Sequence, residues 1–175
     1  LEFARQLYAE GKLSKDQGAI GMDLSEDKLG FCLLIKSDGN GLYATKDLDL
    51  ARKKFAEYEA DQNIYIVDKR QSHHFKQVFK VLEKIGHPKA KDCFHLQYDF
   101  VELPDGAMSS RKGNIVPLQD LIKQMQQTIA DQHLQKYQQE WDEQKLEHTA
   151  HIIAEGAIKY GMLRIDSQKK IVFQM

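Results

Sequence analysis

The spacing of hydrophobic and polar residues changes several times along the chain, and each change predicts a new element. Residues 2–12 place apolar side chains at helical spacing. Apolar runs at 19–24 and 31–36 predict strands joined by a polar, hairpin-like link. The turn-forming sequence SDGNG at 37–41 follows, and LYAT at 42–45 predicts another short strand.

The next part of the chain alternates strands with amphipathic helices. After the strand at 42–45, helices are expected at 46–58 and 72–86, and strands at 64–68 and 93–101. The run IYIVD at 64–68 is continuously apolar, which is typical of a strand buried on both faces of a parallel sheet. This order predicts an α/β fold built from parallel βαβ units with right-handed crossovers.

The last third of the sequence is predicted to be helical. Apolar residues recur at helical spacing from residue 118, and a Gln-rich run at 124–144 continues the pattern. Because leucine, isoleucine, tyrosine and tryptophan interrupt this run, it indicates a solvated helical face rather than a disordered tract. A further helix is expected at 146–163.

Composition places the chain among globular proteins of one domain, or of one domain with an appendage. The 175 residues are 42% hydrophobic and 29% charged, with a formal net charge of −1. Non-specific binding along nucleic acid needs many clustered cations, so the near-neutral charge argues against a DNA-coating protein. No apolar run approaches the roughly 20 residues that cross a bilayer, and no signal peptide is present.

Cysteine usage and the chain ends add two expectations. Cys32 and Cys93 each lie in an apolar run, which predicts buried free thiols and a cytoplasmic location. Neither cysteine has a neighbour at metal-ligand spacing, so no metal site is expected. The chain begins at Leu1 rather than methionine and stops after the apolar KKIVFQM, so we expect it to be part of a longer protein.

Polar residues gather after each of the expected parallel strands, at 45–47, 68–74 and 104–118. Ligands of open parallel sheets bind beyond the carboxyl ends of the strands, so we expect these clusters to share one rim. Structural roles would explain single members equally well. Asp47, expected in the first turn of a helix, would complement the helix dipole, and Tyr43 would serve as half-buried packing.

The loop PDGAMSSRKGNIVPL at 104–118 combines hydroxyls with cations. Ser109 and Ser110 can donate to phosphate oxygens, and Arg111 and Lys112 can neutralise charge that develops on a leaving pyrophosphate. The chain contains no P-loop, no G-x-G-x-x-G and no G-x-S-x-G, which excludes those phosphate-binding and hydrolase motifs. A solvated surface loop is the alternative interpretation.

The order and spacing of longer stretches carry a family resemblance. These stretches are GLYATKDLDLARKKF at 41–55, IYIVDKRQSHHFKQVFKVLEKIG at 64–86 and MSSRKGNIV at 108–116. Over nearly its whole length the chain resembles the catalytic domain of class I arginyl-tRNA synthetases. The resemblance implies that residues 1–117 are the second half of a Rossmann-like parallel-sheet nucleotide-binding domain. Residues 118–175 would be a helical extension that leads toward an anticodon-binding domain.

The resemblance also implies roles for individual residues. The loop at 108–112 matches the mobile Lys-Met-Ser-Lys-Ser element of the family, with the catalytic residues Ser109, Ser110, Arg111 and Lys112. The substrate arginine would be held by Tyr43, Asp47 and Gln71. ATP would be bound by His74, Phe100, Val101, Met108 and Ser109. A carboxylate and an aromatic face suit a planar guanidinium, which supports the assignment of Asp47 and Tyr43 to arginine.

The implied activity is that of an arginine–tRNA ligase. Arginine and ATP, which brings Mg²⁺, would form arginyl-adenylate, and tRNA(Arg) would receive the arginyl group; no membrane or DNA partner is expected. The sequence lacks a His-x-Gly-His element, so the chain by itself is expected to be inactive. A non-catalytic synthetase-derived module that binds RNA or protein is the alternative, and a nucleotide-binding fold of another specificity is a third possibility.

Overall fold

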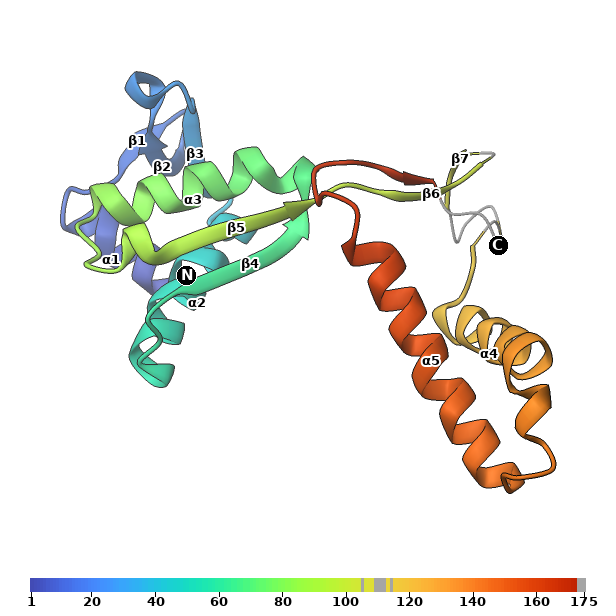
Figure 1. The fold of residues 1–175 in the computed structure, drawn as a ribbon. Coiled ribbons are helices and arrows are strands. Elements are labelled where there is room, and N and C mark those ends of the chain that lie inside the picture. The colour runs from blue at the N-terminus through green and yellow to red at the C-terminus, as the bar shows by residue number, and fades with distance from the viewer. Residues whose placement is uncertain (105, 109–112, 114, 173–175) are drawn as a thin grey trace. The chain divides into compact units, whose positions relative to one another are not determined.

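The computed structural model describes residues 1–104, 106–108, 113 and 115–172. Over the described residues the chain forms two compact units, Leu1–Tyr98 and Asp99–Met175, each with a hydrophobic core of its own (Figure 1). Both contain helices and strands, which gives the mixed α/β fold that was predicted. The boundary expected after residue 117, between the catalytic half-domain and the helical extension, differs from the boundary between these two units and stays a prediction.

The first unit begins with helix α1 (Glu2–Ala9) and an antiparallel sheet in the order β1-β2-β3. Its strands are β1 (Ser14–Asp16), β2 (Ala19–Asp23) and β3 (Phe31–Ile35). The predicted strands at 19–24 and 31–36 are confirmed. Strand β1 was missed because its three residues are polar and exposed, so no hydrophobic pattern marks it.

Helix α2 (Tyr43–Tyr58) starts three residues earlier than predicted, and the expected strand at 42–45 is wrong. Gly41 makes a single antiparallel bridge to Ile35, after which the chain turns directly into the helix. The buried side chains of this helix have helical spacing from its first turn; they are Ala44, Thr45, Leu48, Ala51 and Phe55. Because Thr45 donates its hydroxyl to the carbonyl of Leu34, it anchors the helix to β3 and does not face a ligand.

Of the two predicted βαβ units, the first is wrong because no strand forms at 42–45. The second is confirmed in strand β4 (Asn63–Asp68), helix α3 (Ser72–Lys84) and strand β5 (Cys93–Tyr98). The strands pair in parallel from Asn63↔Cys93 to Asp68↔Tyr98. The apolar face of α3 packs into the core through Phe75, Val78, Val81 and Leu82. The helix ends where Gly86 adopts a positive φ of 80°, which lets His87 N–H donate to the carbonyl of Leu82.

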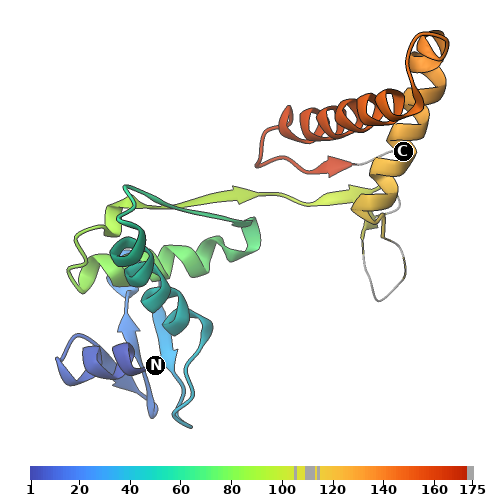
Figure 2. The same cartoon turned by 90° about the horizontal axis from the view of Figure 1, so that it is seen from below.

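The expectation that strand 64–68 is buried on both faces is wrong for this chain. One face of the β4–β5 pair carries Tyr65 and Cys93, which join one core with residues of α2 and α3. The two helices lie on the same side of these strands (Figure 2). The other face is exposed and apolar; it consists of Ile64, Ile66, Phe94, Leu96 and Tyr98, with exposed fractions from 40% to 66%. We call these five residues the open face. Among the residues that the structure describes, no strand besides β4 and β5 belongs to this sheet.

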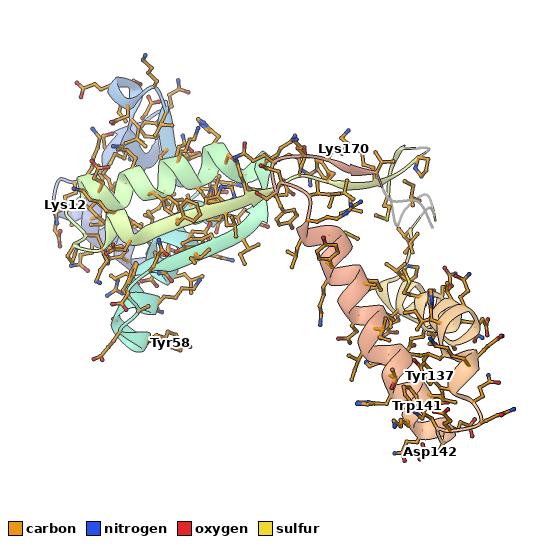
Figure 3. The ribbon with its side chains drawn as sticks, viewed as in Figure 1. Lys12, Tyr58, Tyr137, Trp141, Asp142 and Lys170 are labelled. Carbon is orange, nitrogen blue, oxygen red and sulfur yellow. The ribbon has the colours of Figure 1, made fainter. Side chains whose placement is uncertain are left out.

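The second unit joins short strands to a helical hairpin. The expected strand at 93–101 is divided, because β5 ends at Tyr98 and β6 (Val101–Leu103) lies in another sheet. At the break, Asp99 N–H donates to the carbonyl of Ser167 (2.8 Å). Strand β6 pairs with β7 (Gly106–Ala107) and with β8 (Ile171–Val172). Lys170, labelled in Figure 3, forms an ion pair with Glu102 (3.0 Å) beside this sheet.

The predicted C-terminal helices are α4 (Leu118–Ile129), which continues through non-α turns to Tyr137, and α5 (Glu143–Leu163). They enclose a small core of their own, made of Ile129, Leu134, Ala150 and Ala154. At the turn between them Tyr137 stacks on Trp141 with ring centroids 4.4 Å apart (Figure 3). Asp142 caps α5 by accepting a hydrogen bond from Lys145 N–H (2.7 Å). Within the described ranges, every helix is too short or too polar to cross a bilayer.

Both cysteines are free and buried, as predicted. Burial raises the pKa of the Cys32 thiol and that of the Cys93 thiol to about 11. We expect iodoacetamide to alkylate them at pH 8 about 100-fold more slowly in the native protein than in denaturant, because the thiolate is the nucleophile. Mass spectrometry of labelled peptides measures both rates, and equal rates would contradict the burial. Because burial disfavours the thiolate, we also expect the free energy of unfolding to fall as the pH rises from about 9, where the unfolded thiols deprotonate, toward 11.

Candidate functional site

A hollow of about 330 Å³ lies on the first unit where α2 meets the start of α3 and the end of β4. It is lined by Tyr43, Asp47, Val67, Asp68, Gln71, His74 and Phe75. Two of the polar clusters found in the sequence, at 45–47 and 68–74, therefore contribute to one hollow. The residues predicted to hold arginine are all among its lining, together with His74.

Helical spacing positions the side chains on each side of the hollow. Tyr43 and Asp47 are four residues apart on α2, so they lie on one face of that helix. Gln71 and His74 are three residues apart at the start of α3. Because α2 starts at Tyr43, Asp47 lies beyond the first turn, and the alternative helix-dipole role does not apply to it.

Asp47 and His74 are in direct contact across the two helices. The His74 Nε2 atom is 2.6 Å from Asp47 Oδ2. Each side chain is about one-quarter exposed, so the pair lies at the wall of the hollow and still reaches solvent. The imidazole meets the ring of Phe75 edge-on, with centroids 5.2 Å apart.

The second carboxylate of the hollow is engaged by a neighbour. Arg70 donates to both oxygens of Asp68, at 3.0 Å from Nε and 2.7 Å from Nη2, and its backbone N–H donates as well (2.9 Å). These hydrogen bonds hold the pKa of Asp68 below its usual range. A forked donor already covers Asp68, so Asp47 is the better acceptor for a cationic ligand.

Two aromatic side chains, Tyr43 and Phe75, line the hollow. Tyr43 is 78% exposed, so the alternative role as half-buried packing is wrong for it. Phe75, which lines the hollow, packs against Tyr65 with ring centroids 5.0 Å apart. Among the described residues the Tyr65 hydroxyl is buried without a hydrogen-bond partner. Burial and the nearby Asp47 charge raise the pKa of Tyr65, so it stays neutral.

Several residues near the predicted clusters have structural roles. Thr45 is buried against β3, and Ser72 donates to the side chain of Gln97 (2.7 Å), which ties α3 to β5. Val67 and Phe75 line the hollow but were not predicted as site residues. Their spacing predicted that they are core residues of a strand and a helix. The same apolar pattern describes a core position and the wall of a site, so it does not distinguish the two.

The remaining predicted residues belong to the second unit or lie outside the described residues. Ser109, Ser110, Arg111 and Lys112 are outside the described part of the chain. Phe100 accepts a hydrogen bond from Ile171 N–H (2.9 Å) and precedes β6, which Val101 begins; Met108 is half-buried after β7. Their expected roles toward ATP stay predictions.

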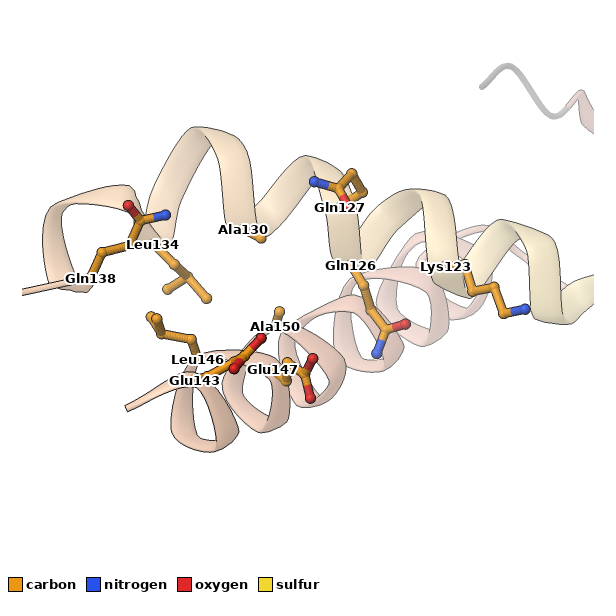
Figure 4. A pocket seen from close by; sticks show the side chains of 10 residues that line it. All are labelled: Lys123, Gln126, Gln127, Ala130, Leu134, Gln138, Glu143, Leu146, Glu147 and Ala150. Atoms are coloured by element: carbon orange, nitrogen blue, oxygen red, sulfur yellow. The ribbon is translucent and has the colours of Figure 1, made fainter. Parts of the chain in front are cut away.

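A second hollow, of about 620 Å³, lies between the two C-terminal helices (Figure 4). Its lining residues are Lys123, Gln126, Gln127, Ala130, Leu134, Gln138, Glu143, Leu146, Glu147 and Ala150. Leu134 and Ala150 belong to the core of the helical hairpin, which makes this hollow the groove between packed helices. None of the residues predicted for function lines it. Within the described ranges, no group of three or more His, Cys, Asp or Glu side chains is placed to hold a metal ion.

Comparison with known proteins identifies the family to which the chain belongs. Residues 2–175 match the family model described as "tRNA synthetases class I (R), catalytic domain". The chain therefore belongs to the class I arginyl-tRNA synthetases, of whose catalytic domain it is a region.

Curated relatives agree with this assignment. The chain is 60% identical over 173 residues to the arginine–tRNA ligase of Bdellovibrio bacteriovorus, with 99% of this chain and 30% of the relative covered. It is 34% identical over 175 residues to the arginine–tRNA ligase of Amoebophilus asiaticus, with 98% and 29% covered. The chain thus spans about 30% of the length of these relatives.

Solved structures show the same fold. The arginyl-tRNA synthetase of Thermus thermophilus superposes with a TM-score of 0.81 at 23% identity, covering 98% of this chain and 35% of that one. The enzyme of Plasmodium falciparum gives a TM-score of 0.79 at 22% identity, covering 99% and 29%. At these identities the likeness concerns the fold alone.

Proposed function

We propose that this chain forms the arginine-binding part of an arginine–tRNA ligase. The observation that carries the proposal is the Asp47 carboxylate, which faces one hollow with the exposed ring of Tyr43 and the amide of Gln71. Family membership supports the substrate class. Because the chain spans about 30% of its relatives, the activity is proposed for the complete protein that carries this sequence.

The hollow suits the side chain of arginine. A guanidinium presents parallel N–H donors in a planar fork, which the two oxygens of Asp47 can accept. The ring of Tyr43 offers an aromatic face for the flat cation, and Gln71 offers an amide oxygen. Lysine carries a compact ammonium, which makes neither the forked contact nor the planar stack.

The proposed reaction has two steps. The arginine carboxylate attacks the α-phosphorus of ATP, and the bond to the β-phosphate breaks, so that pyrophosphate leaves and arginyl-adenylate forms. A hydroxyl of the terminal adenosine of tRNA(Arg) then attacks the arginyl carbonyl and releases AMP. Mg²⁺ enters with ATP as part of that substrate. A cytoplasmic location stays a prediction.

The loop at 108–112 is proposed to act on the triphosphate. Ser109 and Ser110 would donate to phosphate oxygens, and Arg111 and Lys112 would neutralise the charge of the leaving pyrophosphate. His74, Phe100, Val101 and Met108 are proposed, with Ser109, to lie near ATP. Catalysis then consists of positioning and charge stabilisation, without a general base from these residues.

We also propose that the first unit is half of a larger Rossmann-like domain. Parallel sheets are covered on both faces in folded proteins, and the open face here exposes five large apolar side chains. Another part of the complete protein is the proposed cover, since the relatives are more than three times as long as this chain. The isolated chain would then lack catalytic activity.

Replacing Asp47 tests the arginine site. In the complete protein, Asp47→Ala should raise the KM for arginine at least about 100-fold, because the guanidinium loses its counter-charge. ATP–pyrophosphate exchange in the presence of tRNA(Arg) measures it. Asp49→Ala is the matched control, since this carboxylate of the same helix pairs with Arg52 (2.9 Å) and lies outside the hollow. An unchanged KM, or equal exchange with lysine, would refute the site.

Replacing the loop cations tests the proposed charge stabilisation. Arg111→Ala and Lys112→Ala should each lower kcat for adenylate formation by about 10- to 1,000-fold, with the KM for arginine changed less than about threefold. Lys123→Ala on α4 serves as the control for loss of a surface cation. Small and equal effects on both constants would remove the loop from the chemistry.

A charge on the open face tests the half-domain proposal. Ile66 is 66% exposed in this chain. If the open face is also exposed to water in the complete protein, Ile66→Asp should change the free energy of unfolding by less than about 0.5 kcal/mol. If the complete protein covers it, the loss should reach about 3 kcal/mol or more. Urea unfolding of the complete protein distinguishes these outcomes, and Tyr58→Asp, at a residue that is 76% exposed on α2, is the control.

A further inference from the structure

The contact between Asp47 and His74 joins residues that are 27 positions apart in the sequence, one on α2 and the other on α3. An ionised carboxylate only accepts hydrogen bonds, so the imidazole is the donor, through Nε2–H. We propose that His74 is a positioning residue for arginine recognition, which holds the Asp47 carboxylate in the orientation that a guanidinium requires. This inference rests on the proposed arginine site.

The imidazole is fixed from several sides. Phe75, the next residue, is buried, and its ring packs against His74 at 5.2 Å and against His95 at 4.8 Å. The start of α3 is tied to β5 by the hydrogen bond between Ser72 and Gln97 (2.7 Å). His74 therefore presents Nε2 from an anchored turn, which makes it a rigid reference for the Asp47 carboxylate.

The number of acceptor positions leaves room for the ligand. A carboxylate has about four lone-pair sites, and His74 occupies one of them on Oδ2. Oδ1 and the other site on Oδ2 remain for a forked donor. Holding the carboxylate before arginine arrives removes the ordering cost that a freely rotating aspartate would add on binding.

The surrounding charges favour this division of roles. Arg70 already engages Asp68 through both oxygens, so that carboxylate does not compete for His74. The nearby cation on α2, Lys46, lies 6.0 Å from the ring centroid of Tyr43. The single N–H of His74 contacts one oxygen of Asp47, whereas a forked cation such as Arg70 would cover both oxygens and leave less room for arginine.

The inference differs from the role near ATP proposed for the same residue. A positioning role toward Asp47 predicts a change in the KM for arginine, and contact with adenosine predicts a change in the KM for ATP. The two constants therefore report on different partners of one side chain. Nδ1, which does not take part in the contact with Asp47, would be the atom that serves any second partner.

The experiment uses ATP–pyrophosphate exchange by the complete protein. We expect His74→Ala to raise the KM for arginine about 10- to 100-fold; the KM for ATP is measured separately, because the proposed contact with ATP would change it independently. His74→Gln should stay within about threefold of the natural protein, because its amide nitrogen reaches as far as Nε2. His74→Asn, whose amide is shorter, should resemble His74→Ala. His73→Ala is the matched control, since His73 does not line the hollow.

A double-mutant cycle tests whether His74 acts through Asp47. If it does, Asp47→Ala with His74→Ala should lie within about twofold of Asp47→Ala alone. Additive effects would overturn the inference, as would an unchanged KM for arginine in His74→Ala or a change in the KM for ATP alone. An unchanged KM in Asp47→Ala would instead refute the proposed arginine site. Should His74→Ala fail to fold by thermal melting, the contrast between the Gln and Asn variants decides.

Discussion

The parallel pairing of β4 with β5 is the constraint on which the first unit depends. Parallel neighbours cannot be joined by a tight turn, so the chain must cross over through α3. The crossover begins at the carboxyl end of β4 and brings residues 68–74 to that edge of the sheet. Helix α2 packs into the same core beside α3, and residues at the edge of its buried face contact the start of α3. The Asp47–His74 contact is a consequence of this packing.

The two carboxylates of the hollow show how neighbours divide labour between chemically equal groups. Asp68 caps the turn that follows β4 and is covered by the guanidinium of Arg70, so it serves the local fold. Asp47 meets an imidazole, which orients one oxygen and leaves acceptor capacity on both. The difference lies in the geometry of the partner, because a forked cation covers both oxygens of a carboxylate and a single N–H covers one site.

The open face of the β4–β5 pair links the fold to the family comparison. A strand pattern that is apolar on both sides usually describes a sheet with helices on both faces. Here one side packs on α2 and α3, and the other presents Ile64, Ile66 and Phe94 to solvent. The chain covers about 30% of the length of its relatives, which is why the cover proposed for this face is another part of the complete protein.

The sequence by itself determined the helices with clear amphipathic spacing, the parallel βαβ unit and the polar residues that follow β4. These follow from local periodicity, which each segment carries within itself. The structure decided where α2 begins and where β5 ends, because Thr45 and Asp99 make hydrogen bonds to residues far away in the sequence, Leu34 and Ser167. It also decided that His74 meets Asp47. Twenty-seven residues separate them, and only packing of two helices against one core brings such positions together.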